Sequence, residues 1–575
     1  MKFLSRYLKP FYKAMLIGLG IKCFGTLIEL ALPYILSHIL DRVVPEDGRL
    51  SMILLWGGAM VLCALLALVC NIKANRMASK VARDSAETIR RDLFARTLSL
   101  SYKQIDEFTI PSLETRLTTD TYNVQHFVGR IQRLGVRAPL LLMGGLVVTL
   151  VMDLHLALVM LATLPVIFTV VYLVSRYGSG LYSRVQKAVD RMTGVVREDA
   201  RGIRVIKALS RVPKERDRYD SVNTELVRAE KKANLTMGVV NPVMALLMNL
   251  GITFVVLLGA YRVMGGETEA GKIVAFTQYF TMISNATLSM TRIFMMYTKS
   301  SASAERIRQV IDTPMEPVVQ PEEAYPTAAD TAHISFSDVS FAYHTGKNVL
   351  EHVSFSLPKG GTLGIIGATG SGKTTLANLL MRMYDVTEGS VRIDGKDVRT
   401  IPTEELRRKF GIAMQNDFLY ADTVYENIRF GRDLTEEQIR AAARLACAHE
   451  FVMDMPEGYS SMLSSKGSNL SGGQKQRLLI ARAVAAHPEI LVLDDSFSAL
   501  DYKTDATLRA NLRASMEDVT CVLVAQRVSS VMHADLILVL EEGAVIGMGT
   551  HTELLSSCPV YKEIYDTQMG GTIHE

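Results

Sequence analysis

The sequence predicts an all-α membrane domain of six helical spans, followed by a soluble α/β domain. Apolar residues make up 49% of the 575 residues and charged residues only 21%, a balance that suits a chain with part of its surface in lipid. Apolar stretches of roughly 20 residues, long enough to cross a bilayer, are confined to the first half. In the second half, short strand-like runs alternate with helical stretches, the pattern of an α/β domain.

Residues 1–312 form the predicted membrane domain. Basic and apolar residues alternate over the first 13 positions, which predicts a short amphipathic helix on the membrane surface and not a cleavable signal. Six apolar stretches follow, and the third and fourth are separated only by Asp153–His155, which predicts a tight hairpin. The stretches are Met15–Ile39, Ser51–Ile72, Leu134–Met152, Leu156–Val174, Val239–Met264 and Ile273–Tyr297.

The connections between these stretches alternate in length and charge. Lys73–Arg130 and Arg176–Lys232 are long and rich in Arg and Lys, whereas the opposite connections are short. The positive-inside rule therefore places both termini and both long loops in the cytoplasm, and we expect an integral protein of the plasma (inner) membrane. The long loops keep helical periodicity, so the helices should continue beyond the bilayer. Pro111–Thr121 and Arg211–Tyr219 interrupt it and are predicted contact points for a cytoplasmic domain.

Three ionisable residues, Lys22, Glu29 and Arg292, fall inside predicted spans. Such groups usually face a partner or a wet cavity. Lys22 and Glu29 are seven residues apart, about two helical turns, so both could lie on one face. Alternatively, Lys22 and Arg292 lie near a membrane surface and extend their charges to the headgroups.

Composition excludes several kinds of partner. The formal charge of +4 is small, so no nucleic-acid partner is expected. The six cysteines are scattered without a CxxC pair, which indicates neither a metal site nor a disulfide framework. The expected partners are membrane lipid and a transported molecule that no residue identifies.

Residues 313–332 are rich in proline and predict a semi-rigid linker, and residues 333–575 form the predicted soluble domain. There, Gly367–Thr374 reads GATGSGKT between an apolar strand and a helical run, the context of a phosphate-binding loop. Its glycines allow backbone N–H groups to surround a phosphate at a helix N-terminus. The residues expected to bind the nucleotide here are Gly367, Thr369, Gly370, Ser371, Gly372, Lys373, Thr374 and Thr375.

Individual side chains in and near this loop have predicted roles. Lys373 should reach the β- and γ-phosphates, and the Thr374 hydroxyl should bind Mg²⁺. The strand Ile490–Leu493 ends in Asp494, whose carboxylate is expected to hold the same ion. The predicted cofactors are therefore ATP and Mg²⁺.

Further motifs resemble those of an ATP-binding cassette (ABC) transporter of the exporter type. Leu470–Gln474 reads LSGGQ, which matches the signature motif of that family, and Ser498–Asp501 matches its D-loop. Tyr343 stands at the position of the family's adenine-stacking aromatic residue, and Gln415 matches the glutamine that touches Mg²⁺. With six spans and two long loops in the first half, the resemblance covers nearly the whole chain.

This resemblance implies a mechanism. Two cassettes face head to tail, and each ATP lies between the phosphate loop of one and the signature motif of the other. Nucleotide contacts are thus expected from Ser471, Gly472, Gly473, Gln474 and Asp501 as well. ATP binding closes the cassettes, the cytoplasmic loops transmit the movement to the membrane halves, and hydrolysis resets the cycle. A chain with one phosphate loop must pair with a second chain.

Two residues depart from the family pattern at the hydrolytic centre. Asp495 replaces the usual glutamate that polarises water, and its carboxylate is withdrawn by roughly 1.5 Å; a misplacement of about 1 Å can reduce a rate on the order of 10²-fold. Gln526 replaces the switch histidine, and an amide lacks the imidazole's charge and proton transfer. Because the signature motif is intact, the chain resembles the degenerate-site subunit of a heterodimeric multidrug-type exporter. Ser464–Gly467 also lacks an acidic residue common in exporters.

The leading hypothesis is therefore a subunit of an ATP-driven exporter of amphipathic small molecules, lipids or peptides. The partner should carry Glu and His at the two positions and an altered signature motif. The alternatives are a homodimeric exporter in which Asp495 works slowly, an importer of exporter fold, and an ATP-gated regulatory or channel-like membrane protein.

Overall fold

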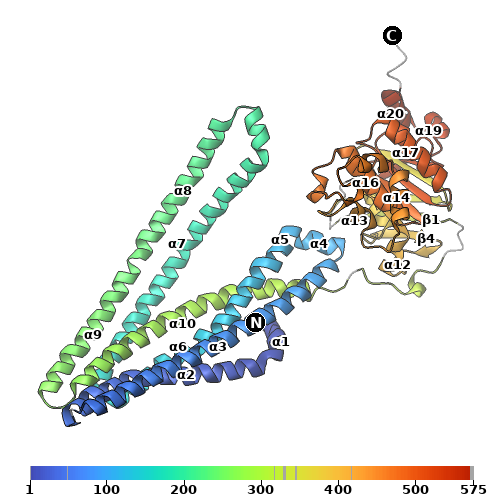
Figure 1. Ribbon diagram of the computed structural model, residues 1–575. Helices are drawn as coiled ribbons and strands as arrows, with labels where there is room; N and C mark the ends of the chain where they lie inside the picture. Colours follow the sequence, from blue (N-terminus) through green and yellow to red (C-terminus); the bar gives the residue numbers. More distant parts are fainter. Residues whose placement is uncertain are drawn as a thin grey trace. The chain divides into compact units, whose positions relative to one another are not determined.

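The computed structural model describes residues 2–47, 49–315, 317–327, 332–343, 346–415 and 418–569. It divides into two compact units, Met1–Leu98 with Pro111–Thr313 and Ser99–Ile110 with Pro314–Glu575. The first unit is helical and the second contains two β-sheets (Figure 1). The predicted fold class, a helical membrane domain followed by an α/β nucleotide-binding domain, is confirmed.

Each expected span falls on one long helix of the first unit. These helices are α2 (Tyr12–His38), α3 (Leu50–Leu98), α6 (Thr121–Met152), α7 (Leu154–Ala208), α9 (Val240–Met264) and α10 (Ala270–Ile311), with α1 (Lys2–Leu8) before them and α8 (Val212–Gly238) between α7 and α9. Within the described residues, four helical segments are long and apolar enough to cross a membrane, namely Phe3–Pro45, Leu50–Leu98, Ile110–Met152 and Val212–Met264. Leu154–Thr163 is a shorter apolar helix. The count of six spans thus stays a prediction.

The long loops are helical, as their periodicity predicts. α3 has 49 residues and α7 has 55. At 1.5 Å per residue such helices extend over about 70–80 Å, more than twice the thickness of a bilayer core. α2, α3, α6 and α10 pack together, and α7 and α8 form a long antiparallel hairpin (Figure 1).

The expected hairpin between the third and fourth stretches is tighter than predicted. Asp153 is the only residue between α6 and α7, and its extended backbone breaks the helix. Its carboxylate Oδ1 accepts from the backbone N–H groups of His155 at 3.0 Å and Leu156 at 3.2 Å, which caps α7. Arg262 of α9 donates to the same oxygen at 3.0 Å. One aspartate therefore fixes the turn between α6 and α7 and ties it to α9.

Lys22 and Glu29 do share one face of α2. Lys22 is buried, and its Nζ donates to Asn71 Oδ1 of α3 at 2.5 Å. Asn71 Nδ2 in turn donates to Glu29 Oε1 at 2.7 Å, and Arg137 Nη2 of α6 donates to Glu29 Oε2 at 3.0 Å. Glu29 is thus paired with a cation and Lys22 with neutral amides between packed helices, which favours an internal polar network over headgroup contact for Lys22. Arg292 of α10 is exposed.

The second unit contains a four-stranded antiparallel sheet and a six-stranded core sheet. The strand orders are β2-β1-β4-β5 and β10-β9-β3-β8-β7-β6, and β10 is the antiparallel strand of the core sheet. β3 pairs on both sides with parallel strands, and its interior positions are buried. Parallel sheets are covered on both faces, which explains the nearly unbroken apolar runs in this half.

The bounds of the remaining elements complete the fold. The strands are β1 (Ile334–Phe341), β2 (Leu350–Leu357), β3 (Thr362–Gly367), β4 (Glu388–Ile393), β5 (Lys396–Asp397), β6 (Phe410–Ala413), β7 (Ile490–Asp494), β8 (Thr520–Ala525), β9 (Leu536–Glu541) and β10 (Ala544–Gly549). The helices are α4 (Tyr102–Phe108), α5 (Ile110–Thr115), α11 (Lys373–Leu380), α12 (Thr403–Arg408), α13 (Val424–Arg429), α14 (Glu436–Leu445), α15 (His449–Met453), α16 (Gly472–Val484), α17 (Tyr502–Ser515), α18 (Val528–Val531), α19 (His551–Ser557) and α20 (Pro559–Met569).

The first of the two predicted contact segments, Pro111–Thr121, begins just after the segment that groups with the nucleotide-binding unit. The segment that belongs to the nucleotide-binding unit is Ser99–Ile110, whereas Pro111–Thr121 belongs to the membrane unit. Ser101 begins α4 with a capping box, in which its side chain accepts from the Gln104 N–H and the Gln104 side chain accepts from the Ser101 N–H. This local start signal lies inside the polar loop, where helical periodicity did not reveal it. The role of Arg211–Tyr219, at the turn before and into α8, stays a prediction.

A buried carboxylate joins the start of α6 to the end of α10. Asp120 is fully buried and accepts from Ser303 Oγ at 2.8 Å and from Arg306 Nε at 2.8 Å, both on α10. Arg306 is 45% exposed, so solvent weakens part of the ion pair. The hydrogen bonds to a buried carboxylate nevertheless anchor the end of α10 to the start of α6.

We predict that Asp120→Ala lowers the stability of the membrane unit by about 1–3 kcal/mol, because a buried anion with charge-assisted hydrogen bonds is lost. The thermal unfolding midpoint of the detergent-solubilised chain measures the effect. Arg308→Ala is the matched control, because Arg308 forms exposed pairs with Glu305 and Asp312 on the same helix. Equal midpoints for Asp120→Ala and the control would show that the Asp120 contacts do not anchor α10.

Candidate nucleotide-binding site

The loop between β3 and α11 requires glycine at three positions. Gly370 and Gly372 have φ angles of +87° and +100°, which favour residues without a Cβ. At Gly367 a Cβ would lie 2.1 Å from the Leu540 carbonyl oxygen, so no larger residue fits against β9. These constraints give the loop the curvature that directs its backbone N–H groups inward at the start of α11.

Lys373 and Thr374 begin α11 beside the end of β7. Lys373 is buried, and its Nζ donates to the carbonyl oxygens of Gly367 at 2.9 Å and Ala368 at 2.7 Å. Burial lowers the pKa of Lys373, and the nearby carboxylates oppose this shift. Thr374 Oγ1 donates to Asp494 Oδ2 at 2.9 Å, so the two predicted metal-binding side chains are in direct contact. Asp494 is only 1% exposed, and burial raises its pKa.

Asp495 follows Asp494 in a left-handed backbone conformation, with φ of +48°. Its N–H donates to Val524 O of β8 at 2.9 Å, which holds the strained turn. Gln415 Nε2 donates to Asp495 Oδ2 at 3.3 Å, and burial raises the pKa of Asp495. The carboxylate that would act on water is thus held by the glutamine predicted to touch the metal.

These side chains line one cavity of about 270 Å³. The structure brings together the ends of β3, β7 and β8, the first turn of α11, and Gln415 after β6. Lining residues that the sequence predicted are Thr369, Gly370, Gly372, Lys373, Thr374, Thr375, Gln415, Asp494, Asp495 and Gln526. Val349, Val524 and Ala525 also line it and had not been predicted, because they are apolar residues without a motif.

The signature residues lie on a different element, outside the lining of this cavity. Ser471 caps α16, its side chain accepts from the Gln474 N–H, and the Gln474 side chain accepts from the Ser471 N–H. A Cβ at Gly473 would lie 3.1 Å from Ala499 O, so a glycine allows α16 to approach the D-loop closely. A Cβ at Gly472 would lie 3.4 Å from the Ala499 Cβ, an ordinary contact distance. Asp501 caps α17 by accepting from the Thr504 N–H at 2.9 Å.

Tyr343 connects the nucleotide-binding region to α4. Its hydroxyl lies 2.9 Å from Thr375 Oγ1, and its ring meets that of Tyr384 edge-on, with centroids 5.0 Å apart. The Tyr384 hydroxyl donates to Asp106 Oδ2 of α4 at 2.7 Å, and the Tyr102 ring of α4 lies 6.1 Å from the Tyr384 ring. Sequence reasoning missed this path, because Tyr384 and α4 are far apart in the chain.

The chemistry of the cavity fits a nucleoside triphosphate with a divalent cation. Ser371 Oγ is buried in the loop without a hydrogen-bond partner, and a phosphate oxygen would accept from it. The curved glycine backbone and the Lys373 ammonium suit a polyphosphate. A hydroxyl, a carboxylate and an amide oxygen from Thr374, Asp494 and Gln415 are hard oxygen donors of the kind Mg²⁺ prefers.

Fold and site define a membrane transporter with a fused ATP-binding cassette, and sequence comparison agrees. Family profiles described as the ABC transporter transmembrane region and the ABC transporter match residues 15–287 and 350–498. The chain is 36% identical over 567 residues to the uncharacterized ABC transporter ATP-binding protein YfiB of Bacillus subtilis (strain 168), covering 98% of each chain. It belongs to the ABC transporter family.

Other relatives agree in length and architecture. The uncharacterized ABC transporter ATP-binding protein Rv1273c of Mycobacterium tuberculosis (strain ATCC 25618 / H37Rv) is 32% identical over 570 residues, with 98% of this chain and 97% of the relative covered. A solved bacterial Atm1-family ABC exporter with ATP bound superposes with a TM-score of 0.83 at 23% identity, covering 98% of this chain and 99% of that one. This likeness shows that the fold is that of an ABC exporter. The match to the transmembrane-region profile makes the chain an integral membrane protein.

We predict that Ser371→Ala has opposite effects on the free and the nucleotide-bound chain. Removing an unpaired buried hydroxyl should raise the unfolding midpoint slightly without ATP, whereas the lost phosphate contact should weaken ATP binding about 3- to 10-fold. Midpoints with and without MgATP measure both effects. Ser515→Ala, at the exposed end of α17, is the control. A variant that binds ATP as the native chain does would exclude Ser371 from the phosphate site.

Proposed function

We propose that this chain is one half of an ATP-driven exporter in the plasma (inner) membrane, with both termini in the cytoplasm. Its cassette would bind MgATP in the cavity at the ends of β3, β7 and β8. In the closed pair the second ATP would lie between the Ser471–Gln474 surface of this chain and the phosphate loop of a partner. The separation of the Ser471–Gln474 surface from the chain's own cavity supports this arrangement, because one cassette alone cannot surround a nucleotide.

The proposal that this chain hydrolyses ATP slowly is based on the presence of Asp495 and Gln526 at the hydrolytic centre. Both line the phosphate cavity, and Asp495 is held at 3.3 Å from the Gln415 amide. A shorter carboxylate in this position reaches less far toward an attacking water, and the Gln526 amide cannot act as an imidazole would. When bound, Mg²⁺ would neutralise the phosphate charge, and this chain's residues would hold the nucleotide for long periods while turning it over slowly.

This proposal makes the chain one member of a heterodimer. The intact LSGGQ segment would complete the faster site on a partner that carries Glu and His at the two altered positions. The cargo would be an amphipathic small molecule, a lipid or a peptide. The polar network around Lys22 and Glu29 supports a transport path with anchors for polar groups, because charges are kept inside helix packing at a free-energy cost.

The first test is the ATPase rate of the chain purified alone and reconstituted in lipid. We expect negligible turnover from the native chain and a rise on the order of 10²-fold in the Asp495→Glu/Gln526→His double variant. The longer carboxylate and the imidazole restore the missing reach and proton transfer, and a second copy of the chain would supply its intact LSGGQ segment. Adding Lys373→Ala to the double variant is the control and should abolish the gain. Native turnover on the order of 1 s⁻¹ or more would instead indicate a working homodimer.

A second test addresses the hydrogen bond that would hold α4 against the rest of the nucleotide-binding unit. Tyr384→Phe removes the hydrogen bond to Asp106 but keeps the ring against Tyr343. We expect a coupling free energy of about 1–2 kcal/mol between Tyr384→Phe and Asp106→Asn in a double-mutant cycle of thermal stability, because the bond is charge-assisted. Additive effects would show that α4 does not dock through this bond.

The control cycle replaces Asp106→Asn with Glu107→Gln, a neighbouring acidic residue that has no contact to Tyr384 among those the structure shows. This second cycle should give additive effects within about 0.5 kcal/mol.

A further inference from the structure

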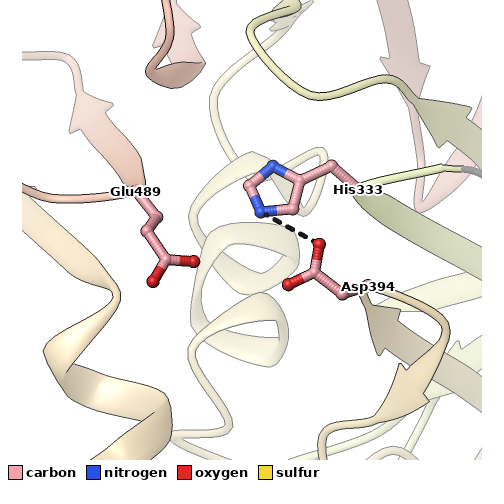
Figure 2. Close-up of side chains that lie close together, drawn as sticks. All are labelled: His333, Asp394 and Glu489. Carbon is pink, nitrogen blue, oxygen red and sulfur yellow. Dashed lines mark ion pairs between the residues drawn. The ribbon is translucent and has the colours of Figure 1, made fainter.

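A second group of polar side chains lies at the end of the core sheet opposite the phosphate loop. His333 precedes β1, Asp394 lies in the turn between β4 and β5, and Glu489 precedes β7 (Figure 2). One imidazole nitrogen and one oxygen from each carboxylate lie within 4.8 Å of one another. β7 is five residues long, so about 17 Å of strand separates this group from Asp494 and the nucleotide cavity.

The His333 side chain is aimed into this group without a hydrogen bond. The residue is 2% exposed, and its Nε2 atom is buried with no hydrogen-bond partner. Nε2 lies 3.6 Å from Asp394 Oδ1, too far for a hydrogen bond. Two ligands at 2.0–2.2 Å from one tetrahedral metal ion are separated by roughly 3.4 Å, so the observed spacing matches shared coordination better than direct contact.

The other imidazole nitrogen has a hydrogen-bond partner that can fix the ring orientation. His333 Nδ1 lies 2.6 Å from Thr520 Oγ1, which also accepts from the Gly360 N–H at 3.0 Å. With a proton on Nδ1 directed at Thr520, Nε2 presents its lone pair to the two carboxylates, and the ring orientation is fixed. Burial lowers the pKa of His333, and the two carboxylates oppose this shift.

The backbone holds all of these residues in place. Asp394 N–H donates to His333 O at 2.9 Å, and Thr520 N–H donates to Glu489 O at 3.0 Å. Asp394 has φ of +50° and is followed by Gly395 at +75°, the conformation of a tight hairpin turn. The ligand positions are therefore set by sheet hydrogen bonds and not by mobile loops.

Lys409 is the cation now paired with the carboxylates. Its Nζ lies 2.6 Å from Glu489 Oε2 and 3.4 Å from Asp394 Oδ2. Lys409 does not contact His333 Nε2. It approaches Asp394 Oδ2, whereas His333 Nε2 lies nearest to Asp394 Oδ1. Lys359 is a second cation near His333, so the two carboxylates of the group face two lysines.

We propose that His333 Nε2, Asp394 Oδ1 and a carboxylate oxygen of Glu489 bind a divalent transition-metal ion such as Zn²⁺. Borderline-soft imidazole nitrogen with two carboxylate oxygens is a ligand set that Zn²⁺ accepts, with water as the fourth ligand. Glu489 is about half exposed and can turn toward the ion, while Lys409 keeps its bond to the second Glu489 oxygen. The ion would join the antiparallel sheet to the start of β7 in the core sheet.

The test uses the full-length chain in detergent, stripped with a chelator and kept in excess Mg²⁺ so that the phosphate cavity is not available to other ions. Equilibrium dialysis against Zn²⁺ and visible absorption with Co²⁺ report binding. We expect one Zn²⁺ per chain, and His333→Gln should weaken this binding at least tenfold and remove the tetrahedral Co²⁺ spectrum. Thr520→Val should weaken it about 10- to 100-fold through the loss of the imidazole partner.

His352→Gln is the matched control, because His352 and Asp338 form a His–Asp pair in the same unit that is more than 70% exposed. This variant should bind Zn²⁺ as the native chain does. Lys409→Met should bind it several-fold more tightly, because a competing cation is removed. ATP binding at the distant cavity checks that each variant is folded, and Glu489→Gln repeats the test at a surface side chain if His333→Gln does not fold.

Two outcomes would overturn the proposal. One is a native chain that takes up no Zn²⁺ at micromolar concentrations. The other is uptake that His333→Gln leaves unchanged, which would show binding at surface histidines only.

Discussion

The hydrogen bond between Thr374 Oγ1 and Asp494 Oδ2 is the contact on which the nucleotide site depends. It joins the first turn of α11 to the end of β7 in a buried setting, so the phosphate loop and the metal carboxylate are positioned together. The bond forms because β3 and β7 are both parallel to β8 and end at the same edge of the sheet. Side chains that follow these strands meet there whatever the length of chain between them.

The same sheet explains why the two groups of polar residues in this unit have different characters. At the carboxyl ends of the strands, glycines, a buried lysine and backbone N–H groups create a site for anions. At the opposite end, Glu489 precedes β7 of the core sheet and meets His333 and Asp394 of the antiparallel sheet, where we propose a site for a cation. Binding at either end would stabilise this unit, because the nucleotide cavity lies on the core sheet and the cation site would join that sheet to the antiparallel one.

Much of the nucleotide site could be predicted because its motifs are local. The glycine pattern of Gly367–Gly372 follows from backbone constraints, and the strand before Asp494 is a plain apolar run. The hairpin between α6 and α7 was likewise predicted correctly, because the polar residue Asp153 interrupts the apolar sequence there. By contrast, α4 begins at a capping box inside a polar loop, and Tyr384 is distant from it in the sequence and contacts it only in the folded chain. The sequence therefore predicted a contact segment that begins after Ile110. His333, Asp394 and Glu489 are separated by 61 and 95 positions, and no spacing rule links them.

The path through Tyr343, Tyr384 and α4 adds a physical reason why a slow site could still be useful. Tyr343, which the family resemblance predicts to stack on adenine, contacts Tyr384, and Tyr384 donates a hydrogen bond to Asp106. Nucleotide that stays bound would keep Tyr343 packed and α4 docked without any hydrolysis, because these contacts involve neither Asp495 nor Gln526. In a heterodimer, such a site would act as a persistent clamp on one side while the partner's site opens and closes. Rapid hydrolysis at both ATP sites would release the α4 contact of both chains in each cycle. The replacement residues Asp495 and Gln526 are therefore consistent with a dimer whose two ATP sites differ.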